Sequence, residues 1–473
     1  MRCGIFPSAW LIGLCVGCAP DPSSPPSSIP SDDAPRLPMI VLTLDTTRAD
    51  HLGFYGYPRS VTPNLDRIAE ESVIFDRCIT PMATTLPAHT SLFTGTYPLE
   101  HGVLANIKHG GRPFPVGAGL DSVAEVADRA GYRTGAVVSA APLKKNTNIS
   151  AGFAFFDEPE GRERNASATM DIALEWLEKN HSTPFFLWVH FFDPHYPLTP
   201  PPQTAGTFSG NDDLSEYFER RGFPPQCLHR NGEVIDTLES INLYDEEILF
   251  VDGAIGRLRE RLEAWDLWER TILIVVGDHG EGLCQHGQRD HGYVHHEQLR
   301  IPLLIKFPGK EPRRIQEVTS IVDVFPIVFE WMGDERWRGF LEQSNGRSRP
   351  NDRNGSRYVF SQRTERKRDD LPPVSYALTG ERWKFIFEPK KQGRTRLFDL
   401  EADPHELRDV LDANEEEAER LTQKISALLE HFSARRAEFF ESNTAADDME
   451  PVDEERLEQL RSLGYVDAAA PGT

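Results

Sequence analysis

The stretch PMIVLTLD, residues 38–45, is an unbroken apolar run that ends in polar residues. This pattern is typical of a strand buried on both faces, because helices cover both sides of a parallel sheet. Two further runs have the same character, PFFLWVHFF at 184–192 and TILIVVG at 271–277. We predict that these three segments are strands of one sheet and that 302–307 adds a fourth.

Segments with helical periodicity lie between these strands. Thr62 and Pro63 supply an N-cap and a proline at the first helical position, and Leu65 and Ile68 then share one side. Further helices are predicted at 120–130, 168–179 and 243–265, with a strand at 134–139. The alternation predicts an α/β fold in which a large, mostly parallel sheet is sandwiched by helices.

From about residue 357 the pattern changes to short alternating runs, which predict a small C-terminal antiparallel sheet. Its strands are expected at 358–362, 383–388 and 395–400, with helices following at 415–440 and 454–463. We expect a signal peptide at 1–18, a tether at 19–37, a catalytic domain at 38–335, a small α+β subdomain at 336–410 and a helical acidic tail at 411–473.

The charge of the chain excludes one class of partner. The 473 residues include 51 Lys and Arg against 74 Asp and Glu, so the net charge is 51 − 74 = −23. Such a field repels phosphates, which excludes nucleic-acid binding by charge alone. A site for an anionic substrate would need a local cation, either a metal or a few placed basic groups.

The N-terminus indicates export. Its apolar segment at 4–17 is shorter than the ~18 residues of a spanning helix and fits the core of a signal peptide. The segment ends at Cys18, before a Pro/Ser-rich stretch, and so resembles the lipobox of a bacterial lipoprotein, although Cys15 stands where leucine is usual. The resemblance implies a lipidated Cys18 and a periplasmic or cell-envelope protein that meets the membrane only through this anchor. The alternative is an ordinary secretory signal.

The remaining cysteines exclude a disulfide scaffold. Beyond the signal only Cys78, Cys227 and Cys284 are left, which allows at most one disulfide. This part of the chain has no CxxC zinc pattern.

Polar residues stand at the ends of three predicted strands. Asp45 ends the first, Asp193 and His195 follow the second, and Asp278 and His279 end the third. Ligand sites in open α/β sheets lie beyond the carboxyl ends of the strands, so these groups can converge. One such aspartate alone is more often a turn former. Together they predict a metal site, in which carboxylates with imidazole suit Zn²⁺ or Mn²⁺ and fewer histidines favour Ca²⁺ or Mg²⁺.

The segment TTLPAHTSLFTG, residues 84–95, is bracketed as a short helix by Pro87 and Gly95, with Thr85 just ahead of its start. A hydroxyl at this position faces unpaired N–H groups, which favour an anionic oxygen or substrate. The alternative interpretation is a plain threonine cap.

This segment resembles the sulfatase signature Cys/Ser-x-Pro-Ser-Arg-x-x-x-x-Thr-Gly, with Thr85 at the nucleophile position. Further matches keep the family order over residues 39–409: LDTTRADHLG at 44–53, DPH at 193–195, GDHGE at 277–281, VDVFP at 322–326, LFDL at 397–400 and DP at 403–404. The resemblance implies an alkaline-phosphatase-superfamily fold and hydrolysis or transfer at a sulfate or phosphate ester.

The departures from the signature change the expected chemistry. Sulfatases oxidise the nucleophile to formylglycine, and Thr85, with a methyl group on its β-carbon, cannot yield that aldehyde. His89 replaces the activating arginine and Thr46 the usual second aspartate. The Gly-Lys-Trp-His stretch of sulfatases is absent, with only Lys144 and Lys145 nearby.

What remains resembles relatives with a threonine nucleophile, in which a metal-activated hydroxyl attacks phosphorus. The resemblance implies one metal (Zn, Mn or Ca) on Asp45, Asp278, His279 and Thr85. It implies a second, weaker site on Asp193, His195 and His291. Otherwise His195 and His291 contact substrate oxygen or protonate the leaving group, and His89 and His101 are candidates for binding the substrate anion.

We therefore expect a metal-dependent hydrolase of small-molecule, glycan or lipid phosphate or sulfate esters, with Thr85 as nucleophile. Two alternatives stay open. One is an arylsulfatase-like sulfuric ester hydrolase that works without formylglycine. The other is a non-catalytic, envelope-tethered protein that binds anions or glycans, although intact Asp45, Asp278 and His279 argue against a scaffold without chemistry.

Overall fold

The computed structural model describes residues 36–107, 119–209, 214–228, 232–347, 357–364, 374–389 and 395–440. The chain divides into one unit over Met1–Ala34 and another over Pro35–Thr473. Cys18, the tether before residue 36 and the helix expected at 454–463 lie outside the described residues, and the expected domain boundaries remain predictions. No helix in the described ranges is long and apolar enough to cross a membrane.

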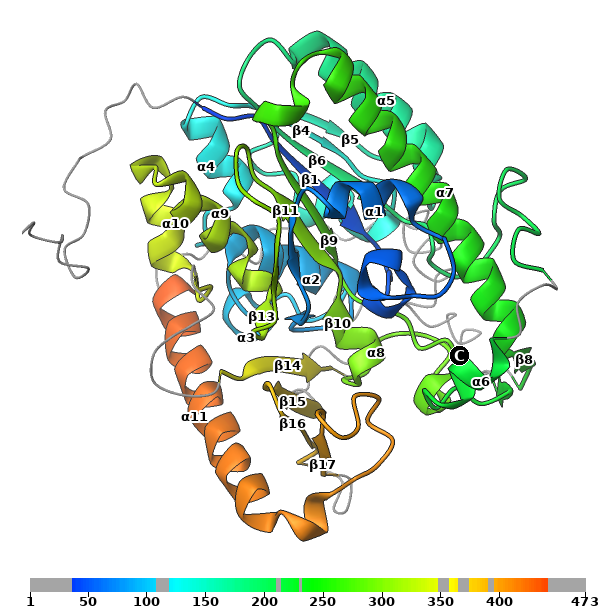
Figure 1. The fold of residues 1–473 in the computed structure, drawn as a ribbon. Helices are drawn as coiled ribbons and strands as arrows, with labels where there is room; N and C mark the ends of the chain where they lie inside the picture. The colour runs from blue at the N-terminus through cyan, green and yellow to red at the C-terminus, as the bar shows by residue number, and fades with distance from the viewer. Residues whose placement is uncertain are drawn as a thin grey trace, which may run out of the picture. The chain divides into compact units, whose positions relative to one another are not determined.

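An eight-stranded sheet forms the centre of the second unit (Figure 1). Its order is β12 (Arg313–Ile315), β2 (Val73–Phe75), β11 (Leu303–Lys306), β9 (Ile272–Gly277), β1 (Met39–Leu44), β6 (Phe185–Phe191), β4 (Arg133–Val137) and β5 (Phe155–Asp157). The pairs among β9, β1, β6, β4 and β5 are parallel, as predicted. The fourth predicted strand, β11, is present but runs antiparallel to β9 and β2.

Both faces of this sheet are covered, which explains the unbroken apolar strands. Along β1, Met39 and Val41 enter one hydrophobic cluster, whereas Ile40 and Leu42 enter the cluster on the other face. The second face is covered by α1 (Pro63–Ala69), α5 (Ala166–Asn180) and α7 (Thr237–Ala264). The first is covered by α2 (Thr85–Thr94), α4 (Val123–Arg129), α9 (Val324–Met332) and α10 (Arg338–Gln343).

A second, antiparallel sheet follows near the C-terminus of the described chain. It contains β14 (Val359–Arg363), β15 (Ser375–Thr379), β16 (Trp383–Phe387) and β17 (Arg396–Asp399) in that order. The strand β15 was not among the predicted ones. The helix α11 (Glu415–Phe440) runs along this sheet (Figure 1) and buries Leu421, Ile425 and Phe432 in the same cluster as Phe360 and Leu378.

Shorter elements complete the unit. They are the strands β3 (Cys78–Ile79), β10 (Arg300–Ile301) and β13 (Thr319–Ser320), the hairpin β7 (Gln226–Leu228) and β8 (Val234–Asp236), and the helices α3 (Pro98–His101), α6 (Ser215–Glu219) and α8 (His296–Leu299). Cys227 of β7 forms a disulfide with Cys284, 57 residues later, in the loop that follows β9. Cys78 is a buried free thiol.

Candidate active site

The predicted convergence of strand ends takes place at β1, which lies between β9 and β6. Leu44 of β1 stands opposite Gly277 of β9, so Asp45 and Asp278 follow neighbouring strands at one edge of the sheet. His279 comes next in the chain. The parallel sheet therefore brings these three side chains together from segments more than 200 residues apart in sequence, as roughly expected of strand ends in an open α/β sheet.

Two buried carboxylates meet here without hydrogen-bond partners for most of their oxygens. Neither oxygen of Asp45 has a partner, and Asp278 Oδ2 has none. Asp278 Oδ1 accepts hydrogen bonds from the backbone N–H groups of Thr46 and His279. Burial raises the pKa of Asp45, and the charge of Glu281 raises it further; burial and the charge of Asp45 raise the pKa of Asp278. Such a pair is unfavourable unless a cation or protons neutralise it.

His279 completes a set of groups that fits a divalent cation. Its Nε2 lies 3.4 Å from Asp278 Oδ2 and 3.8 Å from Asp45 Oδ1. Its Nδ1 donates to the carbonyl of Gly280 at 3.0 Å, which leaves the lone pair on Nε2. Burial lowers the pKa of His279, so the ring is neutral. Ligand atoms of the three residues lie within 4.8 Å of one another, and carboxylate oxygens with imidazole nitrogen are the donors that Zn²⁺ and Mn²⁺ accept.

Thr85 lies beside these groups. It is the first residue of α2, and its Oγ1 is 3.5 Å from His279 Nε2. The N-cap position of α2 is held by Thr84, so Thr85 is not the cap that the alternative interpretation requires. The side chain is fully buried.

His89 stands one turn further along α2 and faces the same site. Its Nδ1 donates to the carbonyl of Thr85 at 2.8 Å and lies 3.7 Å from Asp278 Oδ2. Burial, with a smaller effect from His190, lowers the pKa of His89, so it is a neutral group here. Its role in binding the substrate anion stays a prediction.

His101 does not join the site, contrary to the expectation. Its Nε2 bonds to Ser91 Oγ at 2.9 Å, and its Nδ1 accepts from the N–H of Val103 at 3.1 Å. Burial lowers its pKa to about 3. Because Ser91 of α2 and the backbone of Val103 engage both ring nitrogens, this histidine is a structural residue. Lys144 and Lys145 also lie elsewhere: Lys144 Nζ reaches the carbonyl of Glu160, and Lys145 Nζ lies over the ring of Phe156.

His190 is a site residue that sequence reasoning missed. It lies inside β6, opposite Thr43, and its Nε2 is 3.3 Å from Asp45 Oδ2. The backbone N–H of Ser139 points at His190 Nδ1 from 3.4 Å, which assigns the proton to Nε2. The only signal in the sequence was one imidazole in an otherwise apolar strand.

Two histidines form the more accessible rim of the site. His195 and His291 are 5% and 4% exposed, whereas Thr85, Asp45 and His279 are fully buried. The His291 ring lies 4.4 Å from that of His279 and 5.2 Å from that of His195, measured between centroids. Glu281, whose role was not foreseen, is buried and holds His291 Nδ1 at 3.2 Å from its Oε2.

Of the three residues expected to form a second metal site, His195 and His291 lie together, whereas Asp193 faces the start of α5. Asp193 Oδ2 accepts a hydrogen bond from the N–H of Ala166 at the start of α5, at 2.8 Å, and burial raises the pKa of Asp193 to about 6. Among the residues that the structure describes, close groups of metal-ligand type do not include Asp193, His195 and His291 together. Asp193 therefore acts at a helix terminus.

One other cluster of metal-ligand type contains His286, His295 and Glu297. The two imidazoles are stacked with centroids 4.0 Å apart and an angle of 13° between their planes, so their lone pairs run side by side and do not converge on a point. Each ring already faces a carboxylate: His286 Nδ1 lies 3.1 Å from Glu297, and His295 Nδ1 lies 2.7 Å from Glu406. This cluster is an ion-pair contact between the loop after β9 and the segment after β17.

The chain is similar in sequence and in fold to known sulfatases. A family model described as Sulfatase matches residues 39–334, and one described as N-sulphoglucosamine sulphohydrolase, C-terminal, matches residues 284–435. The chain is 26% identical to the ulvan-active sulfatase of Formosa agariphila, over 65% of this chain and 63% of that protein, which is less than two thirds of its length.

Two other comparisons extend over more of the chain. The multifunctional alkaline phosphatase superfamily protein PehA of Trinickia caryophylli is 24% identical, over 79% of this chain and 90% of that protein. The solved structure of the putative sulfatase YidJ from Bacteroides fragilis superposes with a TM-score of 0.72 at 19% identity, over 85% of this chain and 97% of that one. The two proteins share their fold.

Proposed function

Because this chain belongs to the sulfatase family, we propose that it is a metal-dependent hydrolase of phosphate or sulfate esters with Thr85 as the nucleophile. One observation carries the proposal. The Thr85 hydroxyl lies in contact with His279, beside two buried carboxylates of which three oxygens, both of Asp45 and Oδ2 of Asp278, have no hydrogen-bond donor. A reactive alcohol and an unbalanced negative charge in one buried place are what nucleophilic catalysis with a cation requires.

The cation would be held by Asp45, Asp278, His279 and Thr85 Oγ1. When bound, it supplies positive charge that lowers the pKa of the hydroxyl and offsets negative charge on the ester oxygens. The protein prepares the site for it. Asp278 is oriented through Oδ1 by two backbone N–H groups, and His279 is locked by Gly280 with Nε2 unprotonated.

Thr85 attacks the phosphorus or sulfur atom of the ester. The bond from Oγ1 to that atom forms as the bond to the alcohol oxygen breaks, and water then cleaves the covalent threonine ester to regenerate Thr85. The hydroxyl proton goes to the departing alcohol oxygen. His195 and His291 are the groups suited to deliver a proton there, because they are the more accessible members of the cluster and Glu281 orients His291.

Phosphate esters are the favoured substrate class. A sulfatase with formylglycine uses an aldehyde hydrate, and the methyl group on the β-carbon of Thr85 closes that route. Water can hydrolyse a phosphate ester of Thr85 directly, so phosphate chemistry does not need the aldehyde. Sulfate esters are the second candidate, favoured by the similarity to a sulfatase named as ulvan-active. The ratio of kcat/KM for a matched aryl phosphate and aryl sulfate separates the two.

A non-catalytic role has less support. An anion-binding protein without chemistry would gain nothing from two buried carboxylates, which repel anions. Elemental analysis of the purified protein tests this alternative, because the proposal requires a stoichiometric divalent metal and the alternative does not.

The test of the nucleophile uses three proteins. Thr85→Ala should lower kcat for an aryl phosphate by at least about 10³-fold, because the covalent route is lost, whereas Thr85→Ser keeps a hydroxyl and should retain measurable turnover. Mass spectrometry of the acid-quenched wild-type protein should find a phosphate on the peptide that contains Thr85. Undiminished turnover in Thr85→Ala would sink the assignment.

We also propose that the protein is exported and anchored through Cys18. The disulfide between Cys227 and Cys284 supports export, because such bonds persist in oxidising compartments. Metabolic labelling with a radioactive fatty acid should mark the wild-type protein and leave Cys18→Ser unlabelled. Equal labelling of both would rule out this anchor.

A further inference from the structure

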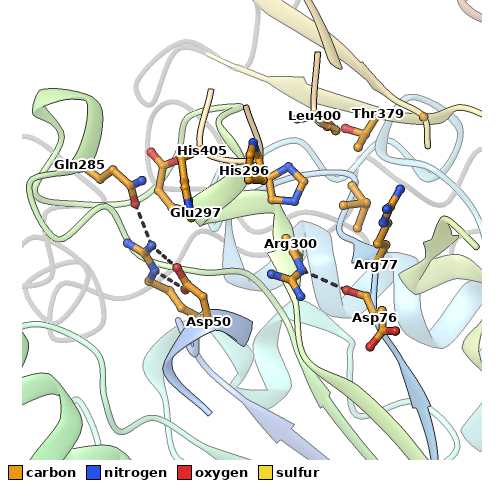
Figure 2. Close-up of a pocket in the computed structure, with 14 residues that line it drawn as sticks. Asp50, Asp76, Arg77, Gln285, His296, Glu297, Arg300, Thr379, Leu400 and His405 are labelled. Atoms are coloured by element: carbon orange, nitrogen blue, oxygen red, sulfur yellow. Dashed lines mark hydrogen bonds and ion pairs between the residues drawn. The ribbon is translucent and has the colours of Figure 1, made fainter. Parts of the chain in front are cut away.

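A cavity of about 250 Å³ lies apart from the metal ligands and Thr85, none of which lines it (Figure 2). Its wall comes from the loop after β1, the segment from β2 to β3, the loop after β9, the helix α8 with the adjoining strand β10, the end of β15 and the segment after β17. Cationic and polar side chains line it, among them Arg48, Arg77, Arg300, His296 and Thr379. No part of the proposed hydrolysis uses this cavity.

Every carboxylate in the wall already has a cationic partner. Asp50 accepts two hydrogen bonds from Arg48, at 2.8 and 2.9 Å. Asp76 pairs with Arg314, whose Nε lies 3.0 Å away, and Glu297 pairs with His286 at 3.1 Å. The negative charges in the wall are therefore neutralised by Arg48 or by Arg314 and His286, which do not line the cavity.

Two arginines in the wall have no such balance. Arg300 donates from Nε to the backbone carbonyl of Asp76 at 3.0 Å, and Arg77 donates from Nη1 to the backbone carbonyl of Glu381 at 2.6 Å. Neither makes an ion pair with a carboxylate within the described residues. Each guanidinium has five N–H donors, so most of these donors remain for a ligand.

A third polar group in the wall lacks a partner. Thr379 is 1% exposed and its Oγ1 makes no hydrogen bond. A buried hydroxyl is seldom left unsatisfied, because the water it loses on burial is not replaced by another hydrogen-bond partner. This hydroxyl and the two unbalanced guanidinium groups all line the same small space, in a chain whose net charge is −23.

We propose that this cavity binds a tetrahedral oxyanion, a sulfate or phosphate group, held by Arg77, Arg300 and Thr379. Guanidinium groups bind such anions through paired N–H donors, and a hydroxyl donor suits a third oxygen. The group can come as the free inorganic ion or as a substituent of a larger molecule. This binding does not depend on whether Thr85 is the nucleophile.

Isothermal titration of the full chain with inorganic phosphate and with sulfate tests the proposal, with chloride at equal ionic strength as the baseline. The double variant Arg77→Gln/Arg300→Gln should lose one binding site or weaken it at least about tenfold. Thr379→Val, which keeps the side-chain volume, should weaken the same site severalfold. The control Arg129→Gln removes an exposed arginine paired with Asp121 and should bind as the wild type does.

Two further arms identify the source of the anion. Glucose 6-phosphate and glucose 6-sulfate are titrated into Thr85→Ala, with glucose as the neutral control. Tighter binding of the sugar esters than of the inorganic ions, lost in the arginine double variant, assigns the cavity to a substituent on a sugar; the reverse assigns it to the free ion. Hydrolysis of these esters by Thr85→Ala would count against the nucleophile only. Equal anion binding in the wild type, the double variant and Thr379→Val would overturn the cavity proposal.

Discussion

His190 stands directly behind the groups proposed to bind metal. The N–H of Ser139 points at Nδ1, which places the ring proton on Nε2, and Nε2 lies 3.3 Å from Asp45 Oδ2. Groups in this position fix the orientation of a metal ligand and set its basicity. In the proposed metal site His190 is thus a positioning residue, which acts through the proposed ligand Asp45.

Replacing His190 should weaken the metal more than it damages the fold. His190→Ala should raise the dissociation constant of Mn²⁺ or Zn²⁺, measured by competition with a chromophoric chelator, by about 10–100-fold. His190→Gln keeps a donor near Asp45 and should recover part of the affinity. The buried control His101→Gln should lower the melting temperature but leave the metal affinity unchanged, because the hydrogen bonds of His101 go to Ser91 and Val103. Equal metal affinity in His190→Ala and the wild type would contradict this role.

These residues show what a sequence can tell about a site. Asp45, Asp278 and His279 were predicted because they follow apolar strands, and strand ends share an edge of a sheet. His190 was not, because its role depends on the register that sets it opposite Thr43. Asp193 also follows a strand, yet its carboxylate meets the first turn of α5. The tertiary structure decides which helix begins beside a given strand end, and the local sequence pattern does not contain this information.

At the scale of elements, the disulfide holds the loop that follows β9. Leu283, Cys284 and His286 have positive φ angles of 44°, 70° and 49°, an unfavourable conformation for residues other than glycine. The same loop carries Glu281 and His291 at the rim of the site. The bond from Cys284 to Cys227 ties this strained segment to the β7–β8 hairpin.

Removing the disulfide should therefore cost stability. Closing a loop between residues 57 apart is worth about 2–4 kcal/mol, so Cys227→Ser/Cys284→Ser should unfold at clearly lower temperature than the wild type. Reductant should lower the melting temperature of the wild type and leave that of the double variant unchanged. Cys78→Ala, which removes the buried free thiol, should keep its sensitivity to reductant. If reductant did not change the melting temperature of the wild-type protein, the prediction would be refuted.

The contact between the loop after β9 and the segment after β17 should make stability depend on pH. Burial lowers the pKa of His286, but the hydrogen bond and charge of Glu297, with the charge of Glu406, outweigh this and raise it to about 9. A folded-state pKa above the unfolded value of ~6.5 stabilises the fold fully below that pH. The contribution, at most about 3 kcal/mol, is lost as pH rises through about 9.

Denaturant unfolding from pH 6 to 10 measures this contribution. Burial and the charge of Asp193 raise the pKa of Glu247 to about 9, so this group titrates over the same range. The contribution of His286 is therefore measured as the difference between the wild type and a His286 variant. His286→Gln should flatten the fall in the free energy of unfolding, whereas His181→Gln, at the end of α5, should follow the wild type. A slope identical in all three proteins would show that His286 is not the group responsible.

Element identity was more predictable than element direction. Unbroken apolar runs identified β1, β6, β9 and β11 because both faces of each are buried. The same pattern cannot give direction, and β11 runs antiparallel to β9. The strand β15 was overlooked because it pairs with β14 and β16 through contacts that only the folded sheet creates.

At the scale of the whole molecule, the charge of −23 opposes the substrates proposed for this protein. The imidazoles of the site add no compensating charge, because burial lowers the pKa of His89, His190 and His279. Under the proposed mechanism, attraction for an anionic ester comes at short range from the proposed cation, while the long-range field of the protein is repulsive. Salt screens the long-range part first, since the Debye length falls from about 30 Å at 0.01 M to about 10 Å at 0.1 M.

The rate of turnover should consequently rise with ionic strength. Between about 0.01 and 0.2 M NaCl we expect kcat/KM for a dianionic aryl phosphate to increase severalfold, through KM, because screening weakens the repulsion. A monoanionic phosphodiester or aryl sulfate should respond about half as strongly in the logarithm, since the interaction scales with substrate charge. The melting temperature over the same salt range serves as the control. It shows whether a higher rate comes from more folded protein or from a higher rate of association between enzyme and substrate. A kcat/KM that falls with salt for both substrates would mean that local positive charge, and not the net charge of the chain, governs the approach of the ester.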